Sequence, residues 1–388
     1  MNLVMPELQR ILILSVSAGL GHLQAAQAVK KAFELERPQV EVAILDTFRY
    51  INPFLDKVMF GTYIEMLKFT PVVYGYLYQL AEKGQPLSET GKEEFNRLLN
   101  RLAAPKLVRF LKDFRPQAVV CTHPFPAGIL DCLKREGHFS LPVAATITDF
   151  TVHSFWIFPG VDLFTVAAED LQPAFIAYGI DPQKVHPVGI PISPCFSAPP
   201  ERPAVHKKLG LDPALPTALV VGGGLGMGPL ADIVRALGNT ERPLQLIVVT
   251  GNNNSLRAKL EKMAPGLKNP VRVLGFVNNV PELMGASDFL VGKAGGLTCA
   301  EALAAGLPIF VVDPLPGQEV RNADFLCGKG AAFRLDGVRE LVQQTEEILG
   351  SPEKLRAMAE KAKRLGKPFA ARDAARLIES LVVNGRCA

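Results

Sequence analysis

Long apolar runs are missing from the 388-residue sequence, and none reaches the roughly 18 uncharged residues that a membrane-spanning helix requires. The first segment, MNLVMPELQR, lacks the basic stretch and apolar core of a secretory signal, so we expect no signal peptide. The six cysteines are scattered without a Cys-x-x-Cys pair, which argues against a disulfide framework and against a zinc site. These absences predict a cytoplasmic protein with reduced thiols.

A large excess of one charge is also missing, because the net charge is only +4 at pH 7. Aromatic residues are not interleaved with basic ones, so we expect no nucleic-acid partner. Most of the basic surplus follows Pro352, where it suits either an anionic membrane surface or a solvated helix face. The 48% of apolar residues suffices for sizeable cores, and the length is about twice that of a typical domain.

The order of apolar runs and turns predicts two α/β halves. The first half opens with a buried strand at 10–17 and a helix from about 23 to 36. After a proline-rich linker at 194–203, the pattern restarts with a strand at 217–221. A short apolar run at 323–326 is expected to add a further strand to the second half.

The most informative stretch is 292–322, in which a strand, a glycine pair, a helix and a second strand follow one another. After Gly295-Gly296 the helix is expected from Thr298 to about Ala305, with Gly306 ending it, and its first N–H groups and partial positive charge suit a phosphate. The loop after the second strand presents three polar side chains suited to sugar hydroxyls, namely Gln318, Glu319 and Asn322. Because ligands bind at the carboxyl ends of parallel strands, this βαβ unit predicts a ligand site.

The motif GGxTxxE at 295–301, followed by PxxGQExxN at 314–322, closely resembles the donor site of GT-B glycosyltransferases of the family 28 type. The similar group holds monogalactosyldiacylglycerol synthases and processive diacylglycerol glucosyltransferases. The resemblance implies an α/β protein with a GT-B fold, in which two Rossmann-like domains with parallel sheets face a central cleft. It implies an acceptor (lipid) domain at 1–195, a UDP-sugar domain at 196–366, and a helix in 367–388 that packs back toward the first domain.

By this resemblance Glu301 binds the ribose, and Gln318, Glu319 and Asn322 bind the donor hexose. Thr298 and Glu301 also match a capping box, in which Glu301 would only bond a backbone amide. The other donor-site residues surround the diphosphate and the uracil. They are Gly21, Gly223, Gly224, Gly226, Gly295, Gly296, Leu297 and Thr298 for the phosphates, with Phe276 and Val277 against the base. Phe276 is equally compatible with a core position.

The first glycine turn carries the motif GxGH, and the resemblance makes His22 the candidate general base. An alcohol is a poor nucleophile until its proton leaves, and an imidazole is well placed to take that proton. Alternatively, His22 caps its own helix. Gly19 and Gly21, with Asp46 after the second strand, also match part of a dinucleotide fingerprint, but Gln24 replaces its third glycine and makes NAD the weaker interpretation.

The sequence TDxxxxHxxW at 148–156 resembles the acceptor-side loop of the glycolipid synthases. It makes Asp149 and His153 second-choice catalytic groups, which either orient His22 or serve as the base, whereas His123 is expected to be structural. The aromatic stretch at 52–86 suits a membrane interface or plain core. The residues expected on the acceptor side are Trp156, Tyr63 and Tyr74.

The sequence therefore predicts an inverting hexosyltransferase that transfers glucose or galactose from a UDP-sugar to diacylglycerol, a glycolipid-synthesis enzyme peripheral on the inner face of the cell membrane. Its expected partners are a UDP-hexose, a diacylglycerol or glycolipid acceptor and an anionic membrane surface, with no cofactor and no metal. The alternatives are a UDP-GlcNAc transferase of cell-wall lipid synthesis and a non-catalytic nucleotide-sugar-binding protein. A monomer and a homodimer are both compatible with the sequence.

Overall fold

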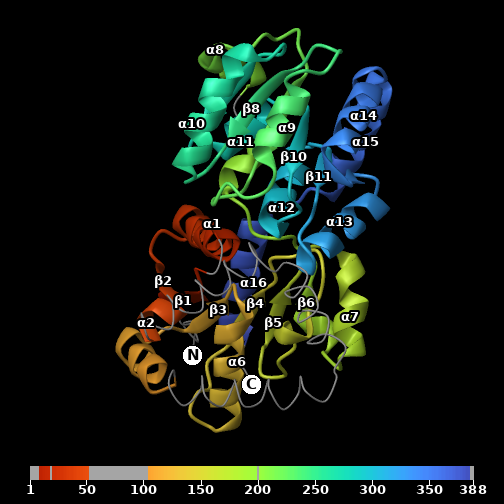
Figure 1. The fold of residues 1–388 in the computed structure, drawn as a ribbon. Helices are drawn as coiled ribbons and strands as arrows, with labels where there is room; N and C mark the ends of the chain where they lie inside the picture. Colours follow the sequence, from red (N-terminus) through yellow and green to blue (C-terminus); the bar gives the residue numbers. More distant parts are fainter. Residues whose placement is uncertain (1–7, 18–19, 52–103, 199–200, 385–388) are drawn as a thin grey trace. The chain divides into compact units, whose positions relative to one another are not determined.

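The computed structural model describes residues 8–17, 20–51, 104–198 and 201–384 (Figure 1). The chain divides into two compact units. Unit 1 comprises residues 1–194 together with 369–388, and unit 2 comprises residues 195–368. The chain therefore leaves unit 1, builds unit 2 and returns to unit 1 in its last helix.

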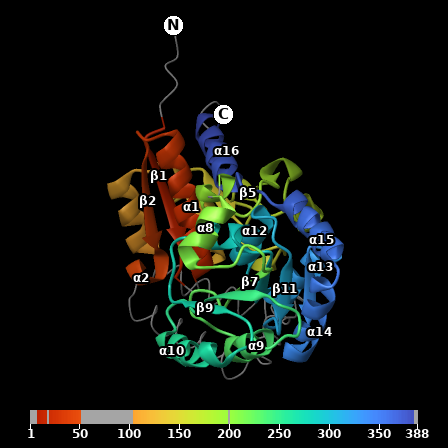
Figure 2. The ribbon, with the colours of Figure 1, turned by 90° about the horizontal axis from the view of Figure 1, so that it is seen from above.

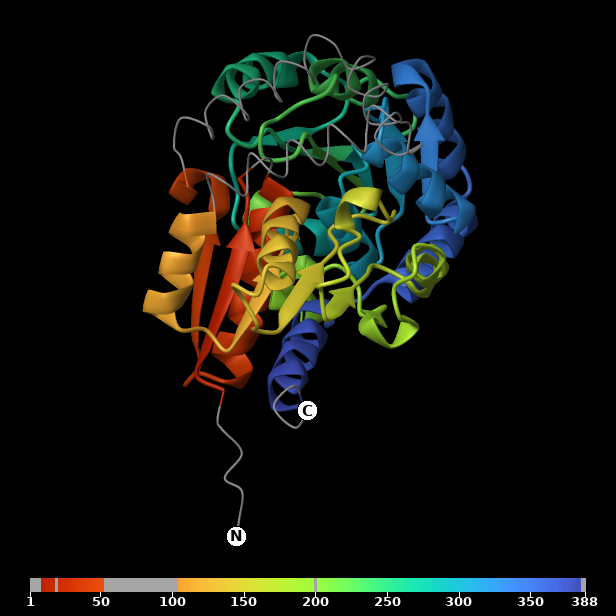
Figure 3. The ribbon, with the colours of Figure 1, turned by 90° about the horizontal axis from the view of Figure 1, so that it is seen from below.

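Unit 1 is built on a parallel sheet with the strand order β2-β1-β3-β4-β5-β6 among the described residues (Figure 3). Its strands are β1 (Arg10–Ser15), β2 (Glu41–Asp46), β3 (Ala118–Cys121), β4 (Val143–Thr146), β5 (Leu163–Thr165) and β6 (Val185–His186). The helices are α1 (Leu20–Glu36), α2 (Thr47–Ile51), a helical segment at 104–114, α6 (Pro124–Arg135), α7 (Gln172–Ala177) and α16 (Ala370–Asn384), with the short 3-10 helix η1 (Ser154–Trp156). β1 is buried beyond its first residue, as its continuous apolar run predicts for a parallel strand.

Helix α16 completes the core of unit 1, and Figure 2 shows it beside α1. Ala374 and Ile378 of α16 are fully buried in one cluster with Val29 of α1. At the surface, Arg376 donates two hydrogen bonds to the Glu36 carboxylate, at 2.9 and 3.1 Å. The apolar face supplies most of the stability of this pairing, because exposed ion pairs contribute little.

Unit 2 repeats the architecture with the strand order β12-β11-β10-β7-β8-β9 among its described residues, all pairs parallel. Its strands are β7 (Thr217–Val221), β8 (Gln245–Val249), β9 (Val271–Leu274), β10 (Phe289–Gly292), β11 (Ile309–Val312) and β12 (Ala332–Leu335). Its helices are α8 (Arg202–Leu209), α9 (Leu230–Leu237), α10 (Asn254–Met263), α11 (Val280–Gly285), α12 (Gly296–Ala304), α13 (Gln318–Gly328), α14 (Gly337–Leu349) and α15 (Pro352–Leu365). The four inner strands are buried except at Val221 and Val249, the last residues of β7 and β8, so the loops at both ends of the sheet are held in place.

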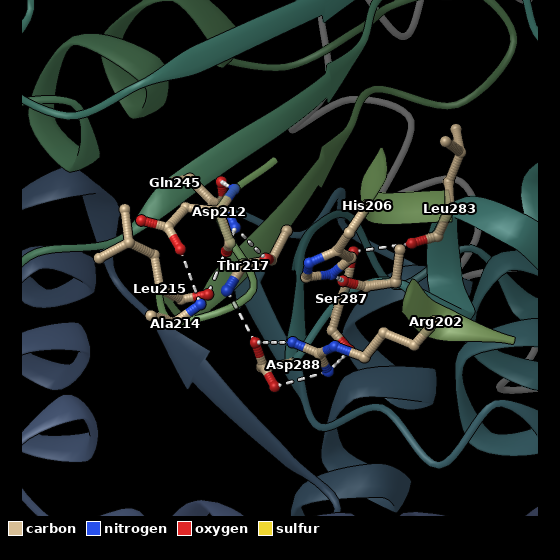
Figure 4. Close-up of polar contacts among 11 residues, drawn as sticks. Arg202, His206, Asp212, Ala214, Leu215, Thr217, Gln245, Leu283, Ser287 and Asp288 are labelled. Carbon is tan, nitrogen blue, oxygen red and sulfur yellow. Dashed lines mark hydrogen bonds and ion pairs between the residues drawn. The ribbon is translucent and has the colours of Figure 1, made fainter. Parts of the chain in front are cut away.

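A polar network anchors the amino ends of the central strands of unit 2 (Figure 4). Arg202 of α8 donates two hydrogen bonds to the Asp288 carboxylate, at 2.9 and 2.8 Å, and Asp288 also accepts the Thr217 amide at 2.7 Å. The buried Gln245 amide donates to the Thr217 hydroxyl at 2.9 Å. Because these contacts satisfy the polar groups at one end of β7, β8 and β10, the opposite, carboxyl ends of these strands remain for a ligand.

Three sequence expectations about local structure were wrong. Helix α1 begins at Leu20 rather than near residue 23, which places Gly21 and His22 in its first turn. Residues 323–326 belong to helix α13, and the buried Ala323 and Leu326 are spaced three apart on one face of it rather than along a strand. Gln318, Glu319 and Asn322 lie on α13 itself, since the helix begins directly after Gly317, whose φ of 103° turns the chain.

Candidate active site

Gly21, in the first turn of α1, belongs to unit 1, whereas the other predicted donor residues are carried by loops and helix starts at one edge of the unit 2 sheet. They follow β11, β10, β7 and β9, and parallel strands present their carboxyl ends at the same edge. The order across the sheet is the α13 start after β11, the α12 start after β10, the glycine turn after β7, and the Phe276 loop beyond β8 after β9. With neighbouring strands about 4.8 Å apart, this edge suits an extended ligand.

The glycine turn at 222–228 is folded by its own backbone and fastened to the loop after β8. Gly223 and Gly226 have φ of 65° and 58°, which ordinary side chains rarely adopt. The Gly224 carbonyl accepts the Asn252 amide at 3.0 Å. Among the described residues no atom accepts the amide of Gly224 or Leu225, so these N–H groups are available to an anion.

We expect Gly226→Ala to destabilise unit 2 by about 2–5 kcal/mol, through left-handed strain and overpacking together. A Cβ at Gly226 would stand 2.3 Å from the Thr250 carbonyl oxygen and 2.8 Å from Asn253 Cβ. Gly223→Ala is the matched control, because its Cβ would meet no heavy atom within 4 Å and only the backbone strain of about 1–2 kcal/mol applies. Thermal denaturation measures both, and equal losses would refute the close approach as the cause.

The start of α12 is open as the sequence predicts. Gly295 is the N-cap residue, no side chain caps the helix, and a Cβ at Gly295 would meet no heavy atom within 4 Å. The amides of Gly296, Leu297 and Thr298 find no acceptor among the described residues. The capping box does not form, because Thr298 lies inside the helix rather than at its N-cap position. The helix therefore offers three N–H donors and the positive end of its dipole.

Glu301 lies on α12, three residues after Thr298. Within the part of the chain that the structure describes, no hydrogen bond or ion pair satisfies its carboxyl group. Burial of that carboxyl raises its pKa to about 8. A desolvated acid without a partner destabilises the folded protein, so its presence points to a ligand that donates hydrogen bonds, such as the hydroxyls of a ribose.

Two of the predicted hexose-binding residues make polar contacts within unit 2. The Glu319 carboxylate accepts Lys293 Nζ at 3.1 Å and the Leu315 amide at 2.9 Å. Asn322 is fully buried, and its Nδ2 donates to the Ala294 carbonyl at 3.0 Å. These contacts fix the loop in front of α12 from the side of α13. Gln318 occupies the first position of α13 and is partly exposed.

Phe276 follows β9 and is 51% exposed, which removes the alternative of a core residue. Its neighbour Val277 is partly buried. An exposed aromatic ring at the ligand edge of a sheet is suited to stacking on a nucleobase. This arrangement supports the expectation that the base lies at the β9 end of the edge.

The predicted base, His22, lies at the carboxyl edge of the unit 1 sheet, where the chain segments after β1, β3 and β4 meet. Its Nδ1 lies 2.8 Å from the Thr122 carbonyl oxygen and 3.0 Å from the Thr148 hydroxyl. Because a carbonyl only accepts, Nδ1 carries the proton and Nε2 keeps its lone pair. Burial lowers the pKa of His22, while the charge of Asp149 and the Thr122 hydrogen bond act in the opposite direction. The imidazole is therefore neutral and able to accept a proton.

The two neighbouring histidines are arranged differently. His123 Nδ1 accepts the Phe125 amide at 3.2 Å and caps α6, and His153 Nδ1 accepts the Phe155 amide at 3.1 Å and caps η1. In the neutral form of each ring the remaining proton is then on Nε2, which donates rather than accepts. This geometry favours His22 over His153 as the base. Asp149 acts on His22 through its charge.

Of the aromatic residues expected on the acceptor side, Trp156 ends η1 and is only 4% exposed. Tyr63 and Tyr74 lie outside the described residues. Among the helices that the structure describes, none combines the length and the apolar character needed to cross a membrane.

The contacts of Asp46 argue against a dinucleotide-binding site after β1. Its carboxylate accepts the Ser17 amide at 3.1 Å and the Ser17 hydroxyl, and it accepts the Arg49 amide at 3.1 Å. An acid that bound the ribose of NAD would need these oxygen atoms for the ligand. Here they connect β1 to the start of α2.

Two family models match the chain. Residues 22–192 match monogalactosyldiacylglycerol (MGDG) synthase, and residues 217–378 match the glycosyltransferase family 28 C-terminal domain. The chain is 31% identical to the probable chloroplastic monogalactosyldiacylglycerol synthase 3 of Oryza sativa, covering 96% of this chain and 74% of the relative. It is 28% identical to the processive diacylglycerol beta-glucosyltransferase of Staphylococcus saprophyticus, covering 91% of this chain and 88% of the relative.

Solved structures share the fold. Acinetobacter baumannii MurG superimposes with a TM-score of 0.63 at 18% identity, covering 96% of this chain and all of that chain. Anabaena Alr3699/HepE in complex with UDP and glucose superimposes with a TM-score of 0.55 at 16% identity, with the same coverage. The likeness to these glycosyltransferases confirms the predicted GT-B fold.

Proposed function

Because the chain belongs to the monogalactosyldiacylglycerol synthase family and is a glycosyltransferase, we propose that it transfers glucose or galactose from a UDP-sugar to diacylglycerol, with inversion at the anomeric carbon. The observation that carries the donor assignment is the unit 2 edge, where backbone amides and a Glu301 carboxyl that have no partner among the described residues lie in one order along the sheet with the exposed Phe276. The processive glucosyltransferases and the MGDG synthase among the relatives support diacylglycerol as the acceptor.

In the proposed reaction the acceptor hydroxyl attacks the anomeric carbon while His22 Nε2 takes its proton. The bond from that carbon to the diphosphate breaks, and UDP leaves with the electron pair. A single displacement of this kind inverts the configuration. The amides at the start of α12 and in the glycine turn stabilise the leaving diphosphate by fixed hydrogen bonds. Glu301 and Phe276 hold the nucleoside.

The test incubates the protein with diacylglycerol vesicles and a panel of UDP-sugars, and follows UDP release and the glycolipid product. We expect turnover with UDP-glucose or UDP-galactose and diacylglycerol, at the membrane surface. Turnover only with a lipid-linked muropeptide and UDP-GlcNAc would assign the protein to cell-wall synthesis instead. UDP-sugar binding without any turnover would make it a binding protein.

We expect the reaction to need no metal ion, because main-chain N–H donors take the place of one at the diphosphate. Turnover measured after exhaustive chelation with EDTA should equal that of untreated protein, and added Mg²⁺ should not raise it more than about twofold. Complete loss in EDTA with recovery on Mg²⁺ addition would contradict this mechanism. Vesicles of neutral lipid, assayed in parallel, separate a metal effect on catalysis from an effect on lipid charge.

A further inference from the structure

Lys293 is a charged residue of the donor edge that lies outside both donor motifs. It lies between β10 and the α12 N-cap, and only 18% of its side chain is exposed. Its stem runs beside the glycine turn, since Cδ and Cγ lie 3.8 and 3.9 Å from the position that a Cβ on Gly228 would occupy. Lys293 therefore lies beside the glycine turn and directly before α12, the two segments whose amides have no acceptor among the described residues.

The position of Lys293 is electrostatically unfavourable for a cation unless an anion lies nearby. The start of a helix carries a partial positive charge, so a lysine directly before it is repelled by the dipole. Glu319 offsets this repulsion through the 3.1 Å ion pair, in which 13% of the Glu319 side chain is exposed. Glu319 is fixed in turn by the Leu315 amide at 2.9 Å, so the carboxylate holds the ammonium group in one place.

The Lys293 ammonium group has N–H donors that no described residue uses. One of its three N–H bonds donates to Glu319, and within the described residues Lys293 Nζ has no other acceptor. A lysine whose only role was to pair with Glu319 would not need to lie beside other free donors. Lys293 lies between the glycine turn and the start of α12, whose amides have no acceptor among the described residues, and a bound diphosphate would place its charge there.

We propose that Lys293 is the cation that binds the diphosphate of the donor, and that Glu319 is a positioning residue for Lys293 rather than a ligand of the hexose. This inference rests on the proposed use of a nucleotide-sugar. The positive charge stabilises the developing charge on the leaving diphosphate, which is the role that a bound metal ion has in other transferases. It also assigns a function to the ion pair that a hexose-binding Glu319 would leave unexplained.

The first test compares the affinities of UDP and uridine by isothermal titration calorimetry. In Lys293→Met we expect UDP affinity to fall about 10–100-fold and uridine affinity to stay unchanged, because only the diphosphate meets the lost charge. Lys293→Arg should recover part of the loss. Lys268→Met is the matched control, since Lys268 is exposed in the loop before β9, at the opposite end of that strand. Equal losses for UDP and uridine, or none for UDP, would overturn the proposal.

The second test separates the two roles of Glu319 with the variant Glu319→Gln. If Glu319 positions Lys293, the affinities for UDP and for UDP-glucose change by the same factor of several-fold. If it binds the hexose, only UDP-glucose loses affinity and the proposal fails. Wild-type protein that does not prefer UDP to uridine would refute the proposed function itself, before any variant is considered. Melting temperatures of the variants confirm that each one is folded.

Discussion

Replacing His22 by asparagine should lower kcat about 10²–10⁴-fold, the range expected for loss of a general base, and leave UDP affinity within about twofold of wild type. Asparagine keeps a nitrogen donor for the Thr122 carbonyl, so the loop after β3 should keep its place. Only the Nε2 lone pair is lost. Turnover of UDP-hexose with diacylglycerol vesicles measures the effect, and calorimetry with UDP gives the affinity.

The pH dependence provides a second readout of His22. Burial lowers the pKa of its imidazole, so the neutral, base-competent form should persist below pH 6.5 and the acid limb of kcat/KM should lie below that value. The asparagine variant should lose this limb. His138→Asn changes an exposed histidine of unit 1 and should leave both kcat and the profile unaltered. An acid limb that survives in His22→Asn would assign the base to another residue.

The second large effect concerns Glu301→Gln, which should weaken UDP binding about 10–100-fold by removing the anionic acceptor for the ribose hydroxyls. In wild-type protein the pKa of Glu301 is about 8, and the bound ribose should lower it because its hydroxyls stabilise the ionised form. Binding then releases a proton. UDP affinity should therefore rise as pH increases from 6 to 8 and level off above 8. The glutamine variant should show no such rise.

The same substitution should stabilise the free protein. The folded-state pKa of about 8 lies above the ordinary value of 4.5, so ionisation of Glu301 favours the unfolded chain as pH rises between these values. Glu301→Gln removes this term and should raise stability by about 2–4 kcal/mol at pH 8, since the pKa difference corresponds to about 1.4 kcal/mol per unit and burial of the glutamine amide offsets part of it. At pH 4.5 the gain should vanish. Denaturant unfolding at the two pH values checks this, and a gain that does not depend on pH would locate its cause outside the carboxyl group.

Sequence patterns predicted those parts of the fold that depend on local chemistry. The bounds of β7 agree with the predicted strand at 217–221, and Gly306 ends α12 with a φ of 71°, its amide bonded to the Leu303 carbonyl and the Leu307 amide bonded to the Ala302 carbonyl. A glycine turn or an N-cap position is determined by a few consecutive residues of the sequence. For this reason the glycine turn after β7 and the open start of α12 were both predictable.

Contacts between distant residues were not predictable from the same patterns. Lys293 and Glu319 are 26 positions apart, and their pairing exists only because β10 and β11 are adjacent and place the two following loops together. The PxxGQExxN motif predicted that Glu319 binds the donor hexose but gave no protein partner for it. Likewise the burial of Trp156 and Asn322 depends on packing, which a single sequence does not specify.

The return of the chain to unit 1 determines the order in which the two units can finish folding during synthesis on the ribosome. Ala371, Ala374, Ala375 and Ile378 of α16 belong to the same core as Ile11 and Ile13 of β1. A nascent chain therefore emerges with a first unit that lacks one of its packing helices, at a stage when every described strand of unit 2 has been synthesised. Although domains usually fold from the N-terminus onward, the second unit here can finish first, and the first must keep an unfinished apolar surface until α16 arrives.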